Sequence, residues 1–435
     1  MKRVLWICNI MLPVIAKELG LSYSNREGWL TGIFNQLAGE KDKKIELGIC
    51  FPVTEWAGEL KKERVSPLVV RGVPCYGFVE DLAHPERYDV SMEESFAEIM
   101  ADFKPDMIHI FGTEFPHALA AEKAFGRPEK TLVGIQGLCG EIARVYQAGL
   151  PDDVYRKRTF RDIIRKDSLM QQQEKFVKRG ELEKEIIKLA GHITGRTRFD
   201  KEGTERINPG AVYHVMNETM RDSFYEGAWS LGACEKHSIF FGQGDYPLKG
   251  FHFMLEAMPD ILQKYPDAKL YVAGNSIMNY STLKDKLKIS AYGKYLLSLV
   301  KKYGLEDKVI ITGRLTEKEM KERFLKANVF VCASVLENSP NTVGEAMLLG
   351  VPVVASYAGG IPDMITDGAD GLLFENKNAE MLAGKVLEIF AANENGAAKK
   401  RLEALSSVAK ERAHHVHDGA SNYNRLLEIY EEMGA

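Results

Sequence analysis

The chain has 435 residues, more than one hydrophobic core normally holds, so we expect two or three domains. Its formal net charge of −4 is not that of a nucleic-acid-binding protein, and no apolar run reaches the ~18 residues that a transmembrane helix needs. The six cysteines are scattered without a C-x-x-C pair, which indicates reduced core thiols and a cytoplasmic protein.

Apolar strands alternate with amphipathic helices along the whole chain. We predict strands at residues 4–9, 45–52, 107–111, 131–135 and 192–195 in the first half, and at 238–241, 269–273, 309–312, 329–332 and 352–355 in the second. This alternation is typical of parallel α/β sheets, and two such sets predict two doubly wound domains. A stretch of little periodicity at residues 221–236 sets the boundary, so the first domain comprises residues 1–220 and the second residues 221–417.

In open α/β sheets the chemistry lies in the loops that follow the strands. Gly28 precedes a predicted helix at residues 33–38, and a glycine there lets the backbone approach a phosphate. Gln136 and Arg196 each follow a predicted strand, although a structural salt bridge is an equally good interpretation of Arg196. His117 lies in another loop after a strand, where a packed or capping histidine is the commoner outcome.

Residues 154–179 carry nine basic and three acidic side chains, a net charge of +6. A solvated helical face is the plainer interpretation of this segment. The alternative is attraction to an anionic membrane surface or to a diphosphate-linked acceptor.

Two carboxylates near the C-terminal end, Glu337 and Glu345, stand eight positions apart on the two sides of a predicted helix start. Between them, Ser339 is a good N-cap and Pro340 suits the first helical position, while Gly350 ends the helix. The unpaired N–H groups and the positive dipole end of such a start attract a phosphate or diphosphate. Carboxylates accept hydrogen bonds from ribose and sugar hydroxyls, so the segment predicts a site for a nucleotide sugar.

The segment 337–347 resembles the E-x7-E motif of retaining glycosyltransferases of family 4, which have the GT-B fold. The match continues through the strand-like residues 350–355, the Gly-Gly loop at 359–363 and residues 367–374. The resemblance implies an α/β protein of the GT-B type, with two doubly wound Rossmann-like domains facing across a cleft. It also implies that a C-terminal helix at about residues 418–435 crosses back to the first domain.

The resemblance implies roles for individual residues. Lys249 neutralises the donor diphosphate, while the arginine that the family uses beside it is replaced by Gln243. Gln136 stands where the family has a histidine that contacts the transferred sugar, and His117 is the candidate to compensate. The catalytic candidates are therefore Glu337, Lys249, Gln136 and His117. The donor-binding candidates are Glu345, Asn338, Ser339, Pro340, Asn341, Thr342, Gly244, Gly313, Arg314, Leu315, Gly28 and Arg196.

By the same resemblance, the protein moves a hexose-type sugar from a nucleotide-diphosphate sugar to an acceptor hydroxyl, with retention of configuration. The acceptor is a carbohydrate or a lipid-linked molecule, in cell-surface polysaccharide or glycolipid synthesis, and the protein works in the cytoplasm or at the inner face of the membrane. No D-x-D pair occurs, so we expect no required metal and no cofactor.

Two alternatives stay open. A nucleotide-sugar-binding protein that has lost catalysis fits the replacements at Gln136 and Gln243, and a test for transfer or donor hydrolysis separates it from an enzyme. Residues 242–247 read Gly-x-Gly-x-x-Pro, a degenerate dinucleotide fingerprint without its third glycine, so a dinucleotide-dependent oxidoreductase is the remote alternative.

Overall fold

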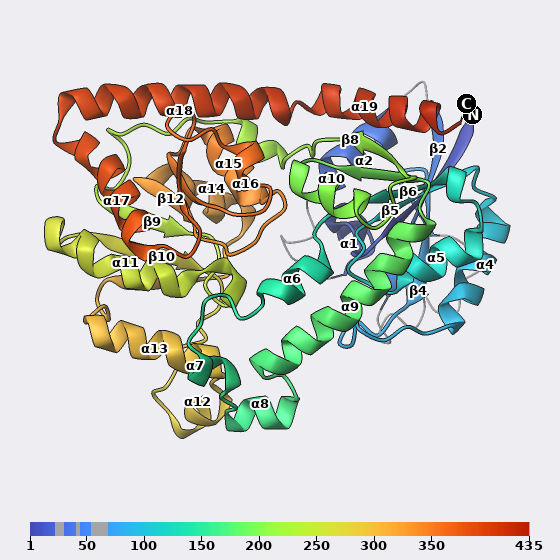
Figure 1. Ribbon diagram of the computed structural model, residues 1–435. Helices are drawn as coiled ribbons and strands as arrows, with labels where there is room; N and C mark the ends of the chain where they lie inside the picture. Colours follow the sequence, from blue (N-terminus) through green and yellow to red (C-terminus); the bar gives the residue numbers. More distant parts are fainter. Residues whose placement is uncertain (22–29, 41–43, 54–67, 435) are drawn as a thin grey trace. The chain divides into compact units, whose positions relative to one another are not determined.

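The computed structural model of the chain describes residues 1–21, 30–40, 44–53 and 68–434 (Figure 1). Its contacts divide the chain into two compact units. The first unit comprises Met1–Ala143, Lys175–Arg221 and His417–Ala435, and the second comprises Arg144–Glu174 and Asp222–Val416. Each unit is built around one β-sheet. Among the described helices, none is both long and apolar enough to cross a membrane.

The sheet of the first unit has eight strands in the order β3-β4-β2-β1-β5-β6-β7-β8. Neighbouring strands are parallel, except that β3 and β4 are antiparallel. The strands are β1 Lys2–Cys8, β2 Ile45–Val53, β3 Leu68–Val70, β4 Val73–Val79, β5 Met107–Phe111, β6 Thr131–Gly134, β7 His192–Gly195 and β8 Val212–Val215. The main helices that contribute to this unit are α1 Pro13–Glu18, α2 Thr31–Gly39, α4 Ser91–Phe103, α5 His117–Phe125, α6 Cys139–Val145, α9 Leu169–Leu189, α10 Arg198–Glu205 and α19 Gly419–Glu432.

The central strand β1 shows how this sheet is buried on both faces. Val4 and Trp6 belong to one hydrophobic cluster, and Leu5 and Ile7 belong to another. Successive side chains of a strand point to opposite faces, so a strand covered on both sides reads as a continuous apolar run. The first cluster also contains residues of α19, whose Tyr430 hydroxyl accepts a hydrogen bond from Trp6 Nε1 at 2.8 Å. The C-terminal helix therefore completes the core of the first unit.

The sheet of the second unit has six parallel strands in the order β11-β10-β9-β12-β13-β14. The strands are β9 Ser238–Phe241, β10 Lys269–Ala273, β11 Val309–Gly313, β12 Val329–Cys332, β13 Val353–Tyr357 and β14 Leu372–Glu375. The helices are α7 Asp152–Arg156, α8 Phe160–Arg165, α11 Phe251–Lys264, α12 Leu283–Lys288, α13 Ala291–Tyr303, α14 Glu317–Lys326, α15 Asn341–Leu349, α16 Ile361–Met364, α17 Ala379–Phe390 and α18 Gly396–Val416. This strand order is that of a doubly wound fold and reverses between β9 and β12, where such folds bind their ligands.

The segment 144–174 belongs to the second unit, although the sequence analysis assigned it to the first domain. Two contacts with the second unit explain the difference. His252 Nε2 lies 3.0 Å from the Ala148 carbonyl oxygen, and the Ala291 N–H donates to Asp162 Oδ2 at 3.1 Å. Neither contact has a local sequence signal, because its partners stand more than 100 positions apart.

The two parallel sheets confirm the predicted α/β class. Five of the ten predicted strands have the predicted bounds, and the others differ by one or two residues at one or both ends. The strands β3, β4, β8 and β14 were not predicted. Strand β4 contains Pro74 and Gly77, which are rare within strands, and β8 is a largely exposed strand at the edge of the sheet.

Candidate functional site

Lys249 and Glu337 meet at the point where the strand order of the second sheet reverses. Lys249 ends the loop after β9, and Glu337 lies in the loop after β12. The Lys249 Nζ lies 2.5 Å from Glu337 Oε1, and the Ser334 hydroxyl donates to the same oxygen at 2.8 Å. Both charged side chains remain accessible, with 30% of the Lys249 side chain and 15% of the Glu337 side chain exposed. The predicted diphosphate-binding cation thus lies directly beside a predicted catalytic carboxylate.

Backbone hydrogen bonds fix the loop after β12 to its neighbours. The Val335 N–H donates to the Leu248 carbonyl oxygen of the loop after β9 at 2.7 Å, and the Gly360 N–H of the loop after β13 donates to the Glu337 carbonyl oxygen at 2.9 Å. Gly250 has a φ of 72°, and a Cβ there would stand 1.9 Å from the Ala333 carbonyl oxygen. Only a glycine fits such a close approach at a left-handed backbone position.

The helix α15 begins one residue later than predicted. Pro340, not Ser339, is its N-cap, with an extended ψ of 118°, and no side chain caps the helix. The prediction of a Ser339 cap was therefore wrong, because Pro340 itself takes the extended cap conformation. Asn341 and Thr342 form the first turn, and the Asn341 side-chain oxygen is buried with no hydrogen-bond partner among the described residues.

The second carboxylate lies inside this helix. Glu345 is its fifth residue and is 4% exposed, and Asn338 in the preceding loop is 5% exposed. The predicted end of the helix is confirmed, since Gly350 ends it with a φ of 77°. The predicted residues 337–342 and Glu345 therefore lie around one helix start.

The remaining predicted donor residues of the second unit lie in loops after β9 and β11. Gly313 is the last residue of β11 and has a φ of 78°, while the next residue, Arg314, is exposed and Leu315 is half-buried. A Cβ on Gly244 would stand 2.7 Å from a Val272 methyl group, so this glycine allows close packing. The Gln243 amide donates to Asp245 Oδ1 at 2.8 Å. The residue that replaces the family arginine is thus held by a carboxylate of its own loop.

In the first unit the structure brings Gln136 and Arg196 together. Arg196 Nη1 lies 2.5 Å from Glu218 Oε2, and both side chains are about nine-tenths buried. Arg196 Nη2 also donates to Gln136 Oε1, at 3.5 Å. These residues line a small cavity of about 30 Å³ with Thr194 and His109. Arg196 is therefore a partner in a structural salt bridge, the interpretation that the sequence left equally open.

His117 is fully buried and forms the first residue of α5. Its Nδ1 lies 2.9 Å from Glu80 Oε2, and its backbone N–H donates to Glu80 Oε1 at 3.1 Å. An imidazole held in this way packs the core and orients the helix start, so we leave His117 out of the proposed catalytic set. Gly28 lies outside the described residues.

Two features of interest had no signal in the sequence. Ser334 contacts Glu337, but a single serine after a strand is too common to single out. Glu183, on α9, accepts hydrogen bonds from the Cys139 and Gly140 N–H groups at 2.7 and 3.1 Å. Burial, with a smaller contribution from the nearby charge of Glu114, raises the pKa of this carboxyl from 4.5 to about 7.

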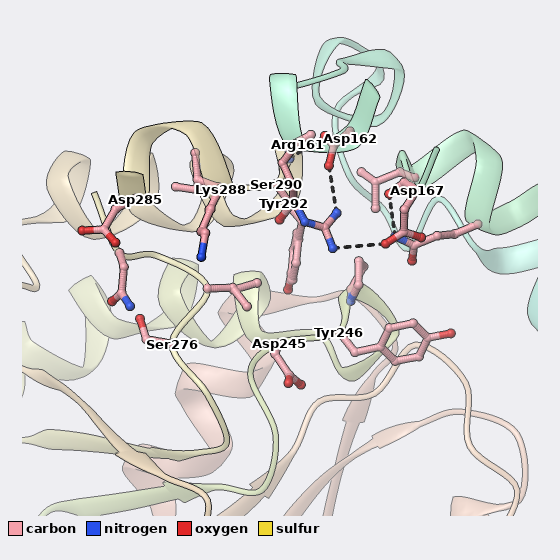
Figure 2. A pocket seen from close by; sticks show the side chains of 17 residues that line it. Arg161, Asp162, Asp167, Asp245, Tyr246, Ser276, Asp285, Lys288, Ser290 and Tyr292 are labelled. Carbon is pink, nitrogen blue, oxygen red and sulfur yellow. Dashed lines mark hydrogen bonds and ion pairs between the residues drawn. The ribbon is translucent and has the colours of Figure 1, made fainter. Parts of the chain in front are cut away.

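A cavity of about 310 Å³ lies beside the loop after β9, within the second unit (Figure 2). Asp245 and Tyr246 come from that loop, and Lys288 comes from the end of α12. Figure 2 shows Arg161 joined by dashed lines to the carboxylates of Asp162 and Asp167. The two ion-pair distances are 3.0 Å and 3.1 Å. A polar cavity of this size is at the lower end of the range for small-molecule sites, roughly 300–1,000 Å³.

Among the described residues, no cluster of His, Cys, Asp or Glu has the arrangement of a metal site. His417 donates through Nδ1–H to the Glu218 carbonyl oxygen at 2.8 Å, and burial lowers its pKa.

The model of the family "Glycosyl transferases group 1" matches residues 234–430, which include α15 and the loops after β9, β11 and β12. The spore coat protein SA of Bacillus subtilis is 25% identical over 247 residues, covering 55% of this chain and 62% of that protein. An uncharacterized glycosyltransferase of Methanocaldococcus jannaschii is 31% identical over 185 residues, covering 41% of this chain and 43% of that protein. The chain thus spans about half the length of these curated relatives.

A solved structure is similar over nearly the whole chain. HepE of Anabaena, in complex with UDP, has a TM-score of 0.64 and 14% identity, covering 99% of this chain and 100% of that chain. HepE has also been solved with UDP-glucose. At this identity the likeness shows the fold, and both sheets take part in it. Residues 234–430 of the chain thus match the glycosyl transferases group 1 family, and the chain has the fold of GT-B glycosyltransferases.

Proposed function

We propose that the protein is a retaining glycosyltransferase that moves a hexose-type sugar from a nucleotide-diphosphate sugar to an acceptor hydroxyl. The observation that carries this proposal is the pairing of Lys249 with Glu337 beside the start of α15, at the reversal of the strand order. Helix N–H groups, a cation and two carboxylates together match the chemistry of a diphosphate flanked by ribose and sugar. The solved complexes of HepE make UDP-glucose the first donor to test.

In the proposed mechanism, the donor diphosphate binds the Lys249 ammonium group and replaces Glu337 as its ion-pair partner. The bond between the anomeric carbon and the diphosphate oxygen breaks, and the acceptor oxygen bonds to the same face of that carbon. The acceptor proton passes to the departing diphosphate oxygen, so no side chain acts as a dedicated base. Lys249 and the N–H groups of α15 stabilise the charge that develops on the leaving group. Glu345 and the buried Asn341 oxygen are placed to accept hydrogen bonds from the nucleoside.

We further propose that the acceptor is a carbohydrate or a lipid-linked molecule and that the reaction serves cell-surface polysaccharide or glycolipid synthesis. The cavity of Figure 2 supports a carbohydrate acceptor, because polar and apolar side chains both line it and it shares the loop after β9 with Lys249. The proposed location is the cytoplasm, at the inner face of the membrane. The basic charge of residues 154–179 supports contact with an anionic surface.

The proposal is tested with UDP-glucose turnover and with calorimetry of UDP binding. Glu345→Ala should weaken UDP binding by roughly 1–3 kcal/mol, because a buried hydrogen-bond partner is lost. Glu337→Ala should lower turnover while UDP binding stays nearly intact. Lys249→Ala should lower the rate by about 10²–10³, as the loss of a preorganised charge does. The control is Lys308→Ala. Lys308 pairs with Asp307 and directly precedes β11, at the end of the strand opposite to Gly313.

Equal loss of UDP affinity in both glutamate variants would contradict this division of roles. Near-normal turnover in Lys249→Ala would show that another group holds the diphosphate. UDP binding without any transfer or hydrolysis would favour the alternative, a catalytically inactive nucleotide-sugar-binding protein.

A further inference from the structure

Two short helices of the second unit, α8 and α12, lie side by side (Figure 1). Both helices expose apolar side chains to solvent. On α8, the exposed fractions are 58% for Phe160, 60% for Ile163 and 67% for Ile164. On α12, they are 80% for Leu283 and 53% for Leu287. Ile163 and Ile164 follow Phe160 by three and four positions, and Leu287 follows Leu283 by four, so the apolar residues of each helix lie on one face.

The inward face of α8 is polar, so the helix cannot rotate to bury its apolar side. Asp162 is 1% exposed and accepts hydrogen bonds from the Thr159 and Ala291 N–H groups at 3.0 and 3.1 Å. It also pairs with Arg161 at 3.0 Å. Rotating α8 by half a turn about its axis would bury Phe160 and Ile164. It would also remove these partners from the buried Asp162 carboxylate, at a large cost in folding free energy. The exposure of the apolar face is therefore built into the fold.

Cations surround this apolar face. Residues 156–166 and 283–288 hold nine basic and two acidic side chains, whereas the whole chain has a formal net charge of −4. One of the two acids, Asp162, is buried in the capping box of α8 behind the N-cap Thr159, so it adds little negative charge to the surface. The exposed basic residues are Arg156, Lys157, Arg158, Arg165, Lys166, Lys284, Lys286 and Lys288.

We propose that this α8–α12 surface docks on an anionic lipid bilayer, with its apolar side chains in the interfacial layer and its cations at the lipid phosphates. Apolar residues rimmed by lysine and arginine are the pattern of interfacial membrane-binding segments. Each cation near an anionic leaflet adds attraction that falls with salt. An apolar patch of this kind on a monomeric protein marks an interaction site, and its one-sided charge selects an anionic partner.

The inference deepens the proposed function at one point, the partner. The proposed function places the membrane contact on the whole basic segment 154–179. The inference places it on the α8–α12 surface instead, and α12 had no signal in the sequence. The inference does not depend on the transfer chemistry, because the residues changed in its test neither belong to the proposed catalytic set nor line the cavity of Figure 2.

Vesicle co-sedimentation of the full-length protein tests the surface. The lipids are phosphatidylcholine alone and phosphatidylcholine mixed with phosphatidylglycerol, each at low and high salt. We expect binding to the mixed vesicles only, weakened by salt. The variant Ile164→Ser/Leu283→Ser should lower the partition coefficient by about tenfold or more, because two interfacial side chains are lost. The variant Arg165→Glu/Lys284→Glu should do the same through charge.

The matched control is Val408→Ser/Lys400→Glu on α18 of the same unit, where Val408 is 46% exposed. It should bind like the wild type. Equal binding to both lipid mixtures, or wild-type binding by the α8–α12 variants, would overturn the proposal. Sedimentation velocity without lipid gives a second check: self-association that these variants abolish would assign the surface to a second copy instead.

UDP-glucose hydrolysis, measured without vesicles, should be the same in the wild type and in these variants. Absence of hydrolysis in every protein, with lipid binding intact, would count against the proposed function and leave the docking surface standing.

Discussion

The carboxyl of Glu183 is a single group whose protonation should be measurable in the stability of the protein. Burial raises its pKa from 4.5 to about 7, against the hydrogen bonds from Gly140 and Cys139, which lower it. A raised folded pKa means that the folded protein holds a proton that the unfolded chain releases. Stability should therefore fall as pH rises through this range, by up to about 3 kcal/mol, and become constant above it.

The variant Glu183→Gln tests this effect because a glutamine does not titrate. We expect the stability of the first unit, which contains Glu183, to fall in the wild type relative to the variant between about pH 5 and pH 8, as measured by the urea-induced transition of that unit at each pH. The control is Glu181→Gln on the same helix, where the Glu181 side chain is 65% exposed. A wild-type-minus-variant difference that stays constant over this range would show that Glu183 is ionised throughout.

At the same scale, the sequence could name residues but not their partners. Lys249, Glu337 and Glu345 were predicted because each has a place in a local motif. In the structure, all three lie in segments that follow β9 and β12, the strands between which the order of the second sheet reverses. The ion pair between Lys249 and Glu337 was not predicted, since the two stand 88 positions apart and meet only through the strand order. For the same reason the contact of His117 was not predicted, because its partner Glu80 is 37 positions away in the sequence.

At the scale of elements, apolar runs predicted the buried parallel strands well because both of their faces are covered. Edge strands such as β8 lack this signal, and their pairing depends on neighbours rather than on their own residues. The start of α15 was misplaced for a different reason. Local preferences favour both Ser339 and Pro340 near a helix start, and only the backbone conformation shows which of them is the cap.

The loop after β12 depends on a close glycine contact that can be tested. Gly359 has a φ of 53°, and a Cβ there would stand 2.0 Å from the Glu337 carbonyl oxygen. Gly359→Ala should therefore displace the loop that carries Glu337 and lower UDP-glucose turnover as well as stability. Gly304→Ala is the matched control, because Gly304 also has a positive φ, 62°, but a Cβ there would meet nothing within 4 Å.

The free energy of unfolding of the Gly304→Ala control should fall only by the cost of a left-handed alanine, roughly 1–2 kcal/mol, and its turnover should not change. Urea denaturation and steady-state kinetics of the two variants give the comparison. Equal losses in both variants would mean that backbone strain alone, and not the contact with Glu337, sets the cost.

At the scale of the whole molecule, the chain holds two compact units, each with its own sheet, so a single unfolding transition is not expected. The proposed donor residues that pair around α15 all belong to the second unit.

A ligand present at 100 times its dissociation constant stabilises the folded state by about 2.7 kcal/mol, which slows amide exchange through global opening by about 100-fold. UDP should therefore slow amide hydrogen exchange in β9 and β12 more than in β1 and β5, as measured by mass spectrometry of peptides from each strand. Uridine, which lacks the diphosphate, should give much less protection. Equal slowing in both sheets would show that the two units open together or hold the nucleotide jointly, and slowing confined to β1 and β5 would place the nucleotide in the first unit.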